Sequence, residues 1–335
     1  MRGRGKLLVT GTATAMLPLL LSGCGRENML DAASPQAHKI ATLFWVMMGV
    51  AWVGLAFVGF LLALGWLRRR RPSPHGGRGE RIGTALVVGL GIAAPIVSLT
   101  LLFIWSNVFV MRSTAAPKPS STSLTVEVIG HQWWWEVHYP GTTAVTANEI
   151  HIPVGKRVNL VGKTADVIHS FHVPQLNRTI DLIPGRTNRI VLEADHAGRF
   201  RGQCYEFCGL QHAHMGLYVI AQPPAEFKAW LANMAKPAPA PTTALEKRGQ
   251  GTFLTQACSG CHQIRGTAAH ATVGPDLTHL ATRSTIAAAT LPNRPGYLGG
   301  WILDPQHQKP GVRMPALTLS GPQIQGLIAY LDSLH

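Results

Sequence analysis

Residues 204–215 read CYEFCGLQHAHM and place two cysteines, two histidines and one methionine within twelve positions. Thiolate, thioether and imidazole ligands together favour copper over hard cations. Because Cys204 and Cys208 are four residues apart in a loop, both thiolates could bridge one pair of copper ions. Zinc is the alternative, but a zinc site has no need of Met215, and its cysteines usually lie closer together. The segment therefore predicts a copper centre.

The sequence around this loop has the pattern of short β-strands. From residue 120 to residue 234, alternating runs rich in β-branched residues are separated by glycine and proline. Such a succession of strands and turns is typical of a β-sandwich domain. The clearest strands are predicted over residues 124–129, 149–152, 157–161, 187–192 and 216–221.

A second cysteine pair lies near the C-terminus. Residues 258–262 read CSGCH, which fits the C-x-x-C-H motif of haem c attachment. In this motif Cys258 and Cys261 bond the haem covalently, and His262 binds its iron. A redox-active dithiol is the alternative, but that motif usually accompanies a βαβ unit. The motif therefore predicts a c-type cytochrome.

The haem iron needs a sixth ligand, and Met314 is the only methionine in residues 244–335. It is followed by Pro315, as in many small cytochromes c. A methionine opposite a histidine raises the haem potential, which suits an electron donor to copper. Four histidines remain alternative ligands: His270, His279, His307 and His335.

The cysteine motif lies within a domain that is predicted to be helical, residues 244–335. Helices are predicted over residues 244–256 and 323–334, the second with its apolar residues on one face. Before them, the sequence KPAPAP at residues 236–241 predicts a stiff, extended linker over residues 235–243.

The N-terminus has the features of a signal peptide. Residues 1–23 combine a basic start, an apolar run and small residues ahead of Cys24. The sequence LSGC at residues 21–24 resembles a bacterial lipobox, and this resemblance implies a lipid on Cys24. An ordinary signal peptide followed by an unmodified cysteine is the alternative. Both interpretations predict that the chain is exported.

Two uncharged stretches are long enough to cross a membrane. There are 28 uncharged residues between Lys39 and Arg68, and 30 between Arg81 and Arg112. About 20 apolar residues span a bilayer. Transmembrane helices are therefore predicted over residues 40–67 and 82–110, within an N-terminal segment of residues 24–119. The arginine-rich connection between them is expected in the cytoplasm, which places both soluble domains outside.

The net charge of +14 could indicate nucleic-acid binding, but its distribution argues against that partner. Residues 1–23 and 68–81 together carry eight of these charges, in the signal peptide and the cytoplasmic connection. Between residues 120 and 234, nine basic residues are balanced by nine acidic ones. We therefore expect membrane lipid, and no nucleic acid, as a partner.

The spacing of residues 204–215, Cys-x-Glu-x-Cys-Gly-x-x-His-x-x-Met, resembles the CuA signature of cytochrome c oxidase subunit II. With the haem motif, the chain resembles the form of that subunit with a fused cytochrome c domain, as in caa-type haem-copper oxidases. The resemblance implies a multidomain membrane protein with a two-helix transmembrane hairpin, a cupredoxin-like β-sandwich and an all-α class I cytochrome c domain. The implied ligands of the dinuclear copper are His169, Cys204, Cys208, His212, Met215 and the main-chain carbonyl of Glu206.

The same resemblance implies roles for further residues. The Glu206 carboxylate is expected at a magnesium site shared with subunit I. Trp133, in the run GHQWWW at residues 130–135, is expected where electrons reach the copper. On a strand, Trp133 and Trp135 would share one face. Packing of the sandwich or contact with the membrane surface is the alternative role of these tryptophans. Two histidines remain alternative copper ligands: His172 and His214.

The implied function is electron relay to oxygen. Electrons from an external donor, such as a cytochrome c or a bc complex, would pass through haem c and CuA to the oxygen-reducing site of subunit I, with subunit III as a further partner. The chain would be a subunit of an oxidoreductase and translocase in the bacterial inner (cell) membrane, with both soluble domains on the periplasmic or extracellular side. The alternatives are the electron-input subunit of a CuA-containing nitric-oxide reductase, and a membrane-tethered electron carrier or copper-delivery lipoprotein.

Overall fold

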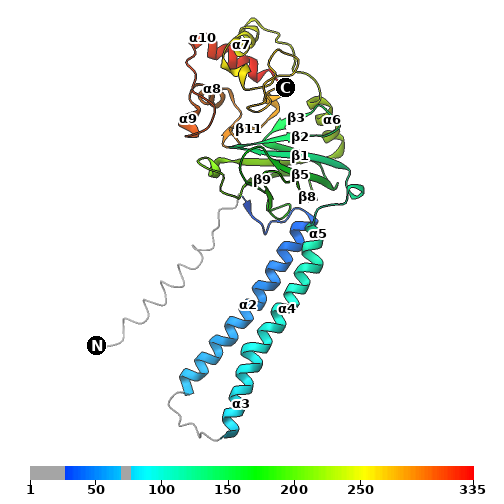
Figure 1. Cartoon of the computed structure of the whole chain (residues 1–335), viewed down its shortest axis with the longest axis vertical. Helices are drawn as coiled ribbons and strands as arrows, with labels where there is room; N and C mark the ends of the chain where they lie inside the picture. Colours follow the sequence, from blue (N-terminus) through cyan, green and yellow to red (C-terminus); the bar gives the residue numbers. More distant parts are fainter. Residues whose placement is uncertain (1–26, 69–76) are drawn as a thin grey trace, which may run out of the picture.

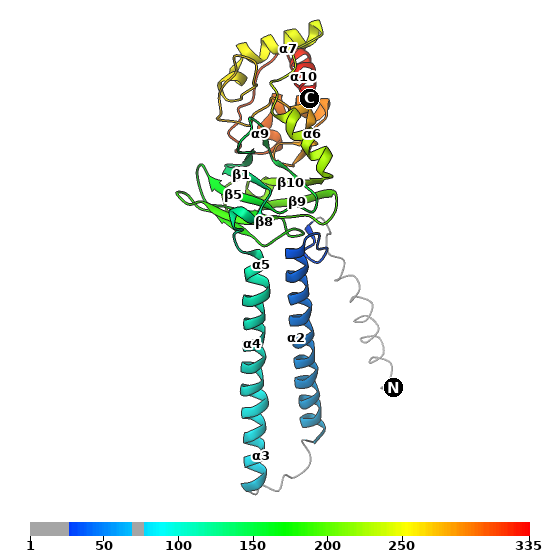
Figure 2. The ribbon, with the colours of Figure 1, turned by 90° about the vertical axis from the view of Figure 1, so that its right-hand side faces the viewer.

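The computed structural model describes residues 27–68 and 77–335. Figures 1 and 2 show three parts along the long axis: a pair of long helices, a β-sandwich, and a helical domain. The sandwich lies between the helix pair and the helical domain. The predicted signal peptide, Cys24 and most of the arginine-rich connection lie outside the described residues.

The helix pair consists of two apolar helices that run side by side (Figures 1 and 2). The spans Pro35–Arg68 and Arg81–Thr114 have 34 residues each and mean hydropathies of 2.3 and 2.4. Both are long and apolar enough to cross a membrane, as the uncharged stretches predict. The first helix is α2 (Pro35–Arg68). The second is continuous over α3 (Gly77–Val88), η3 (Gly89–Ala93), α4 (Ala94–Trp105), η4 (Ser106–Met111) and α5 (Arg112–Thr114).

The helix pair is fixed to the sandwich where α2 begins. Ser34 caps this helix, since its Oγ accepts a hydrogen bond from Ala37 N at 3.0 Å. The same hydroxyl donates to the carbonyl of Leu176 in the sandwich. Next to it, the N–H of Ala33 donates to Gln175 O at 2.8 Å. These bonds hold the first helix against the sandwich.

The sandwich consists of two five-stranded sheets, and each contains one parallel pair, β1 with β5 and β4 with β10. Each of the five strands predicted from the sequence is present and begins within one residue of its predicted position. The first sheet has the order β3-β2-β1-β5-β8: β1 (Leu124–His131), β2 (Trp134–His138), β3 (Val145–Ala147), β5 (Val158–Thr164) and β8 (Asn188–Leu192). The second has the order β4-β10-β9-β6-β7: β4 (Glu149–Pro153), β10 (Gly216–Gln222), β9 (Gly198–Cys204), β6 (His169–His172) and β7 (Ile180–Leu182).

The core of the sandwich follows from strand alternation. Val126 and Val128 of β1 are fully buried, because successive side chains of a strand point to opposite faces. They belong to one apolar cluster with Trp135, Leu160 and Val219 from both sheets. This packing fixes the ends of the strands, where the candidate copper ligands lie.

The strands β1 and β2 form a hairpin in which His131 pairs with Trp134. Gln132 and Trp133 make its turn, so the GHQWWW run does not lie on one strand. The turn has no asparagine or glycine at its centre, and these are the residues that usually reveal a two-residue hairpin. Trp133 and Trp135 are nevertheless both buried, while Trp134 is half-buried.

The helical domain is bounded by two capped helices. Thr243 and Glu246 form a capping box at the start of α7 (Ala244–Thr255), and Ser320 forms another at the start of α10 (Gly321–Asp332). The predicted helices 244–256 and 323–334 are thus present. The second begins two residues early because Pro322 suits a first helical turn. Between them lie η7 (Ala257–Gly260), η8 (Leu280–Thr282), β11 (Thr285–Ile286), β12 (Leu291–Pro292), α8 (Pro295–Leu303) and α9 (Pro305–Gln308).

The predicted linker, residues 235–243, follows α6 (Pro224–Met234) and has no helix or strand. It lies against the helical domain. Ala238 N donates to Arg265 O at 2.9 Å, and Lys236 O accepts from His279 Nε2 at 3.1 Å. The first part of the linker is therefore held against the helical domain.

The helices α7 and α10 cross closely at two buried glycines, Gly249 and Gly326. A Cβ atom on Gly249 would overlap the Gly326 carbonyl, so glycine is required at this crossing. One turn further along, the rings of Phe253 and Tyr330 pack edge to face with centroids 6.3 Å apart. This contact forms part of the core of the helical domain.

We predict that Gly249→Ala destabilises the helical domain by about 2 kcal/mol or more, because the added methyl forces the two helices apart. Thermal unfolding of the full chain, followed by the absorbance of its predicted haem, measures the effect. The control is Gly251→Ala on the exposed face of α7, where a Cβ meets nothing within 4 Å. That change should stabilise the domain by about 0.5–1 kcal/mol. Equal melting temperatures of the two variants would contradict the prediction.

Candidate metal centres

The five side chains predicted to bind copper come together at one end of the sandwich. His169 begins β6 and Cys204 ends β9. Cys208, His212 and Met215 lie in the loop that joins β9 to β10. The antiparallel pairing of β6 with β9 brings His169 to this loop from 35 residues earlier in the chain.

The two cysteine sulfurs are 3.8 Å apart. A metal–thiolate bond is about 2.3 Å long, as for zinc, so one ion can contact both sulfurs. The remaining candidate ligands surround this pair. Their distances are His169 Nδ1 to Cys204 Sγ, 3.8 Å; His212 Nδ1 to Cys208 Sγ, 3.6 Å; Met215 Sδ to Cys208 Sγ, 3.8 Å; and Glu206 O to Cys204 Sγ, 3.3 Å.

The chemistry of these ligand atoms fits copper as well as their positions do. His169, Cys204, Cys208 and Met215 are buried, and both cysteines are free thiols. The hydrogen bond between the two thiols lowers the pKa of Cys204, and the separate contact of Cys204 with the His169 ring acts in the same direction. The contact between the thiols raises the pKa of Cys208. Soft sulfur ligands with imidazole, shielded from water, are the ligands that copper prefers.

Asp166 orients the first histidine of this cluster. The outer nitrogen of His169, Nε2, donates to Asp166 Oδ1 at 2.8 Å, and Gln132 N donates to the other carboxylate oxygen at 2.7 Å. Burial opposes ionisation of Asp166, but these bonds outweigh it and hold the pKa of the carboxyl below its usual value. A carboxylate behind a histidine fixes the ring and raises its basicity as a ligand. Asp166 was not predicted from the sequence, although an aspartate three residues before a candidate histidine ligand is a usable signal.

The two alternative histidines have other partners. His172 Nδ1 lies 2.7 Å from the hydroxyl of Thr179, and its ring packs on Tyr205 with centroids 3.9 Å apart. His214 Nδ1 lies 2.9 Å from Gln211 Oε1. The geometry therefore favours His169 and His212.

Tryptophan and glutamine side chains hold the copper loop through its carbonyls. Trp133 Nε1 and Gln132 Nε2 both donate to Cys208 O, at 3.0 and 2.8 Å. Trp135 Nε1 donates to Met215 O at 3.3 Å. Gly209 has φ of +115° and lies so close to Trp133 that a Cβ would be 2.9 Å from its ring. Trp133, the residue predicted where electrons reach the copper, thus lies directly on the ligand loop.

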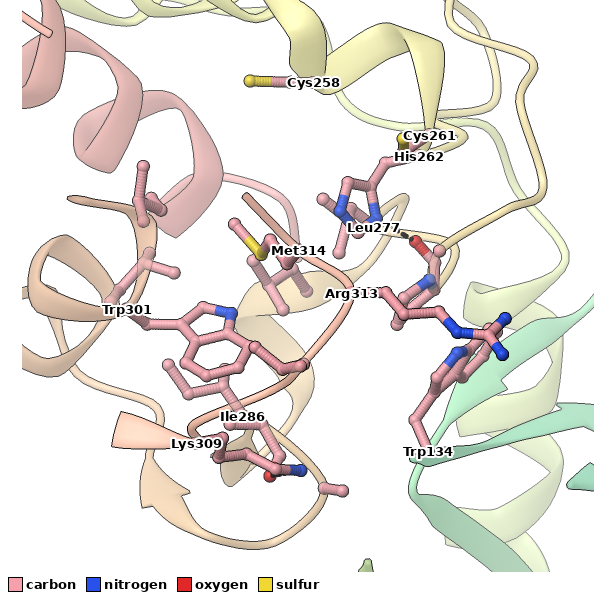
Figure 3. A pocket seen from close by; sticks show the side chains of 18 of the residues that line it. Trp134, Cys258, Cys261, His262, Leu277, Ile286, Trp301, Lys309, Arg313 and Met314 are labelled. Carbon is pink, nitrogen blue, oxygen red and sulfur yellow. Dashed lines mark hydrogen bonds between the residues drawn. The ribbon is translucent and has the colours of Figure 1, made fainter. Parts of the chain in front are cut away.

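A largely apolar cavity lies beside the CSGCH motif in the helical domain (Figure 3). Cys258, Cys261, His262 and Met314 all line it. Figure 3 shows His262 and Met314 facing the same space, with Trp134 of β2 at its edge. The arrangement fits a haem bonded through the two cysteines, with an imidazole and a thioether for its iron.

His262 has one ring nitrogen free to bind the haem iron. Its Nδ1 donates to Pro275 O at 2.8 Å, which leaves Nε2 for the iron. Burial lowers the pKa of His262, so the ring is neutral at physiological pH. Gly274 lies against the ring, because a Cβ there would be 2.6 Å from Cε1. The ring is thus held in one orientation.

Met314 is the best placed of the candidates for the sixth ligand. The histidines that line the cavity, among the described residues, are His131 and His262. His279 is buried elsewhere, with its two ring nitrogens 2.8 and 3.1 Å from the carbonyls of His335 and Lys236. His270, His307 and His335 are exposed.

Arg283 is a further cavity residue that the sequence analysis missed. It is buried, lines the cavity and donates to the Asp276 carbonyl, yet its Nε has no hydrogen-bond partner among the described residues. A buried guanidinium with a free N–H is suited to binding a carboxylate. Haem carries two carboxylates, so the orphaned nitrogen supports the fit of haem to this cavity. A single arginine with no neighbouring motif gave the sequence analysis no signal.

The copper loop also presents an exposed face. Phe207 is 76% exposed and Leu210 is 78% exposed, although both are large apolar side chains. Tyr205 and Glu206 beside them are also exposed. Apolar side chains gathered around a buried site are typical of an interaction surface.

Comparisons with known proteins match the two regions in which the candidate sites lie. The family model of cytochrome C oxidase subunit II, periplasmic domain, matches residues 142–222, and that of cytochrome c matches residues 246–335. A cytochrome c oxidase subunit 2 from Alkalihalophilus pseudofirmus is 35% identical over 96% of this chain and 97% of its own length. The subunit from Bacillus subtilis is 28% identical over 96% of each chain. The periplasmic domain of subunit II of the Bradyrhizobium japonicum cytochrome oxidase is 32% identical, covers 36% of this chain and 96% of that structure, and has a TM-score of 0.34.

We predict that His169→Ala abolishes the electron paramagnetic resonance signal of a dinuclear copper centre, because it removes a ligand adjacent to Cys204. His172→Ala is the matched control, since this half-buried ring lies on the same strand but bonds to Thr179. It should leave the signal intact. An unchanged signal in His169→Ala would refute the assignment.

We predict that Met314→Ala removes the low-spin, six-coordinate absorption spectrum of the haem and lowers its reduction potential by on the order of 0.1 V, because the thioether favours the reduced iron. Redox titration of the purified chain measures both changes. His307→Ala, on the exposed helix α9, is the control and should change neither. If only a histidine variant alters the spectrum, that histidine is the ligand instead.

Proposed function

Because the chain belongs to the cytochrome c oxidase subunit II family, in a form with a C-terminal cytochrome c domain, we propose that it relays electrons from haem c through dinuclear copper to a catalytic subunit I. Cys258 and Cys261 would hold the haem, with His262 and Met314 as the ligands of its iron. The copper pair would be held by both Cys204 and Cys208, together with His169, His212, Met215 and the Glu206 carbonyl. Both groups supply one-electron redox chemistry, which amino-acid side chains of this kind do not provide alone.

The observation that carries this proposal is the continuity of the two sites. The haem cavity is lined by Gln132, Trp133 and Trp134 of the sandwich in addition to residues of the helical domain. Gln132 and Trp133 are the residues whose side chains bond Cys208 O in the copper loop. Residues that line the haem cavity therefore also bond the copper loop. The two sites are adjacent, as an electron relay requires.

The exposed face of the copper loop is the proposed contact with subunit I. Tyr205, Phe207 and Leu210 offer apolar surface next to the bridging cysteines. The exposed Glu206 carboxylate lies in the same loop, while its carbonyl is 3.3 Å from Cys204 Sγ. One residue would thus serve the copper through its main chain and a magnesium ion, shared with subunit I, through its side chain.

The arrangement of the domains supports a membrane orientation. The helix pair extends from the side of the sandwich opposite the helical domain (Figure 1). With the helices in the bacterial cell membrane, both soluble domains face the periplasmic or extracellular side, and the haem domain lies farthest from the membrane. An exported N-terminus with a lipid on Cys24, as the sequence predicts, would have the same orientation. The haem is then the first centre that an external donor, such as a cytochrome c or a bc complex, reaches.

The test is turnover of the complex purified through this chain. We predict oxygen consumption with a reduced donor and co-purification of subunit I, and we expect subunit III as well. In Cys204→Ser, haem c should become reduced by the donor and stay reduced, with oxygen uptake lowered at least about 100-fold, because the next electron carrier is missing. In Cys261→Ser the copper signal should persist, while reduction of the copper by the donor should fail.

Two results would contradict the proposal. Turnover of nitric oxide without turnover of oxygen would indicate a reductase of that substrate. Isolation of the chain with both cofactors but no large haem protein would indicate a tethered carrier or a copper-delivery protein.

A further inference from the structure

Lys309 is buried between the helical domain and the sandwich, with 2% of its surface exposed. Its Nζ lies 2.9 Å from His214 O, 3.2 Å from Ala287 O and 3.4 Å from Trp133 O. An ammonium group has three N–H donors, and each of these carbonyls accepts one. Burial lowers the pKa of Lys309 to about 8, so the side chain stays largely protonated at neutral pH. The lysine therefore joins the two domains through a fully bonded charge.

The second of these carbonyls, that of Ala287, belongs to an unusual turn between β11 and β12. Ala287, Ala288 and Ala289 have φ of 53°, 56° and 59°, the left-handed region that residues with a side chain rarely adopt. Their carbonyls accept from Lys309 Nζ at 3.2 Å, Gly216 N at 3.1 Å and an Arg201 guanidinium N at 3.5 Å, respectively. Two of these donors belong to the sandwich. The strained turn thus directs all three carbonyls at groups that join the domains, and strain of this kind is typical of functional sites.

The hydrogen bond from Gly216 N to Ala288 O begins next to the candidate copper centre. Gly216 follows the candidate ligand Met215 and begins β10. A Cβ on Gly216 would lie 3.2 Å from Ala288 O and 3.3 Å from the Ala289 side chain, so glycine permits this close approach. The contact joins the backbone of the copper ligands to the turn.

The other face of the turn touches the haem cavity. Ala287, Ala288 and Lys309 all line that cavity, and Figure 3 shows Lys309 at its edge. One hydrogen bond, from Gly216 N to Ala288 O, therefore connects the wall of the haem cavity to the peptide group between Met215 and Gly216.

The segment from Lys309 to Met314 makes a second link. Arg313 donates to Gln132 Oε1 at 2.6 Å, and Gln132 donates to Cys208 O at 2.8 Å. Arg313 precedes the candidate axial ligand Met314. This segment therefore contacts the copper loop directly at Lys309 and, through Gln132, at Arg313.

We propose that Lys309 is a positioning residue that holds the haem domain on the copper loop, so that electrons pass from haem to copper across the contact between Ala288 and Gly216. This inference rests on the proposed function. In the step, the haem iron loses one electron and the copper pair gains one, and no bond or proton is exchanged. Lys309 itself carries no electron; its three hydrogen bonds keep the two sites in register.

The test is Lys309→Met in the full chain, assembled with its partner subunits. Methionine keeps an unbranched side chain but removes the ammonium that donates to the carbonyls of Trp133, His214 and Ala287. We expect faster hydrogen–deuterium exchange in residues 209–216 and 284–290. We also expect electron transfer from photoreduced haem to copper to slow by at least about tenfold, since small misplacements reduce rates strongly. The haem absorption and copper resonance spectra should be unchanged.

Two further variants complete the design. Lys247→Met, at an exposed lysine of α7, should change neither exchange nor rate. Gly216→Ala keeps Lys309 but pushes the turn away, and it should reproduce the faster exchange of residues 284–290 and the slower transfer. It provides the test if Lys309→Met does not assemble.

Three outcomes separate the proposal from its alternatives. Unchanged exchange in residues 209–216 with an unchanged rate would overturn it. Faster exchange confined to the helical domain, again with an unchanged rate, would also overturn it, because Lys309 would then only support the cytochrome fold. Absence of haem c or dinuclear copper from the unmodified complex would instead refute the proposed function on which the inference rests.

Discussion

The surrounding structure holds the sulfur atoms of Cys204 and Cys208 3.8 Å apart, within reach of a common metal at the candidate copper centre. Cys204 is fixed as the last residue of β9, whereas Cys208 lies in the loop that follows. The hydrogen bond between the two thiols lowers the pKa of Cys204. The pairing of β9 with β6 then adds His169, so the candidate ligand set follows from the register of two strands.

A buried loop that binds a metal also has to satisfy its own backbone groups. Cys208 O accepts from Gln132 and Trp133, and Met215 O accepts from Trp135. His214 O, however, accepts from Lys309 of the helical domain, and Gly216 N donates to Ala288 of that domain. An unpaired buried polar group costs about 1–3 kcal/mol. The helical domain thus completes the hydrogen bonds of the copper loop, and the two domains depend on each other.

The sequence predicts local features well because both metal motifs are contiguous, as CYEFC and CSGCH are. The strands and the terminal helices also follow from periodicity and capping residues. His169 needed the resemblance to a family, because no local pattern connects it to a loop 35 residues away. The turn at Gln132 and the left-handed alanines after β11 were hidden, since tryptophan favours strands and alanine has no preference for positive φ. Contacts between domains, such as those of Lys309, depend on docking that no single segment encodes.

The docked position of the cytochrome domain also changes the way in which its fusion to the sandwich would assist electron transfer. A flexible tether raises the local concentration of a donor but leaves its orientation free. Here the linker lies along the helical domain through Ala238, and a charged lysine is buried at the interface. The strained alanine turn and the buried Lys309 ammonium both depend on hydrogen-bond partners in the sandwich. Undocking would remove these partners, which would be unfavourable. The energetics therefore favour one docked orientation, in which the haem cavity and the copper loop share a wall.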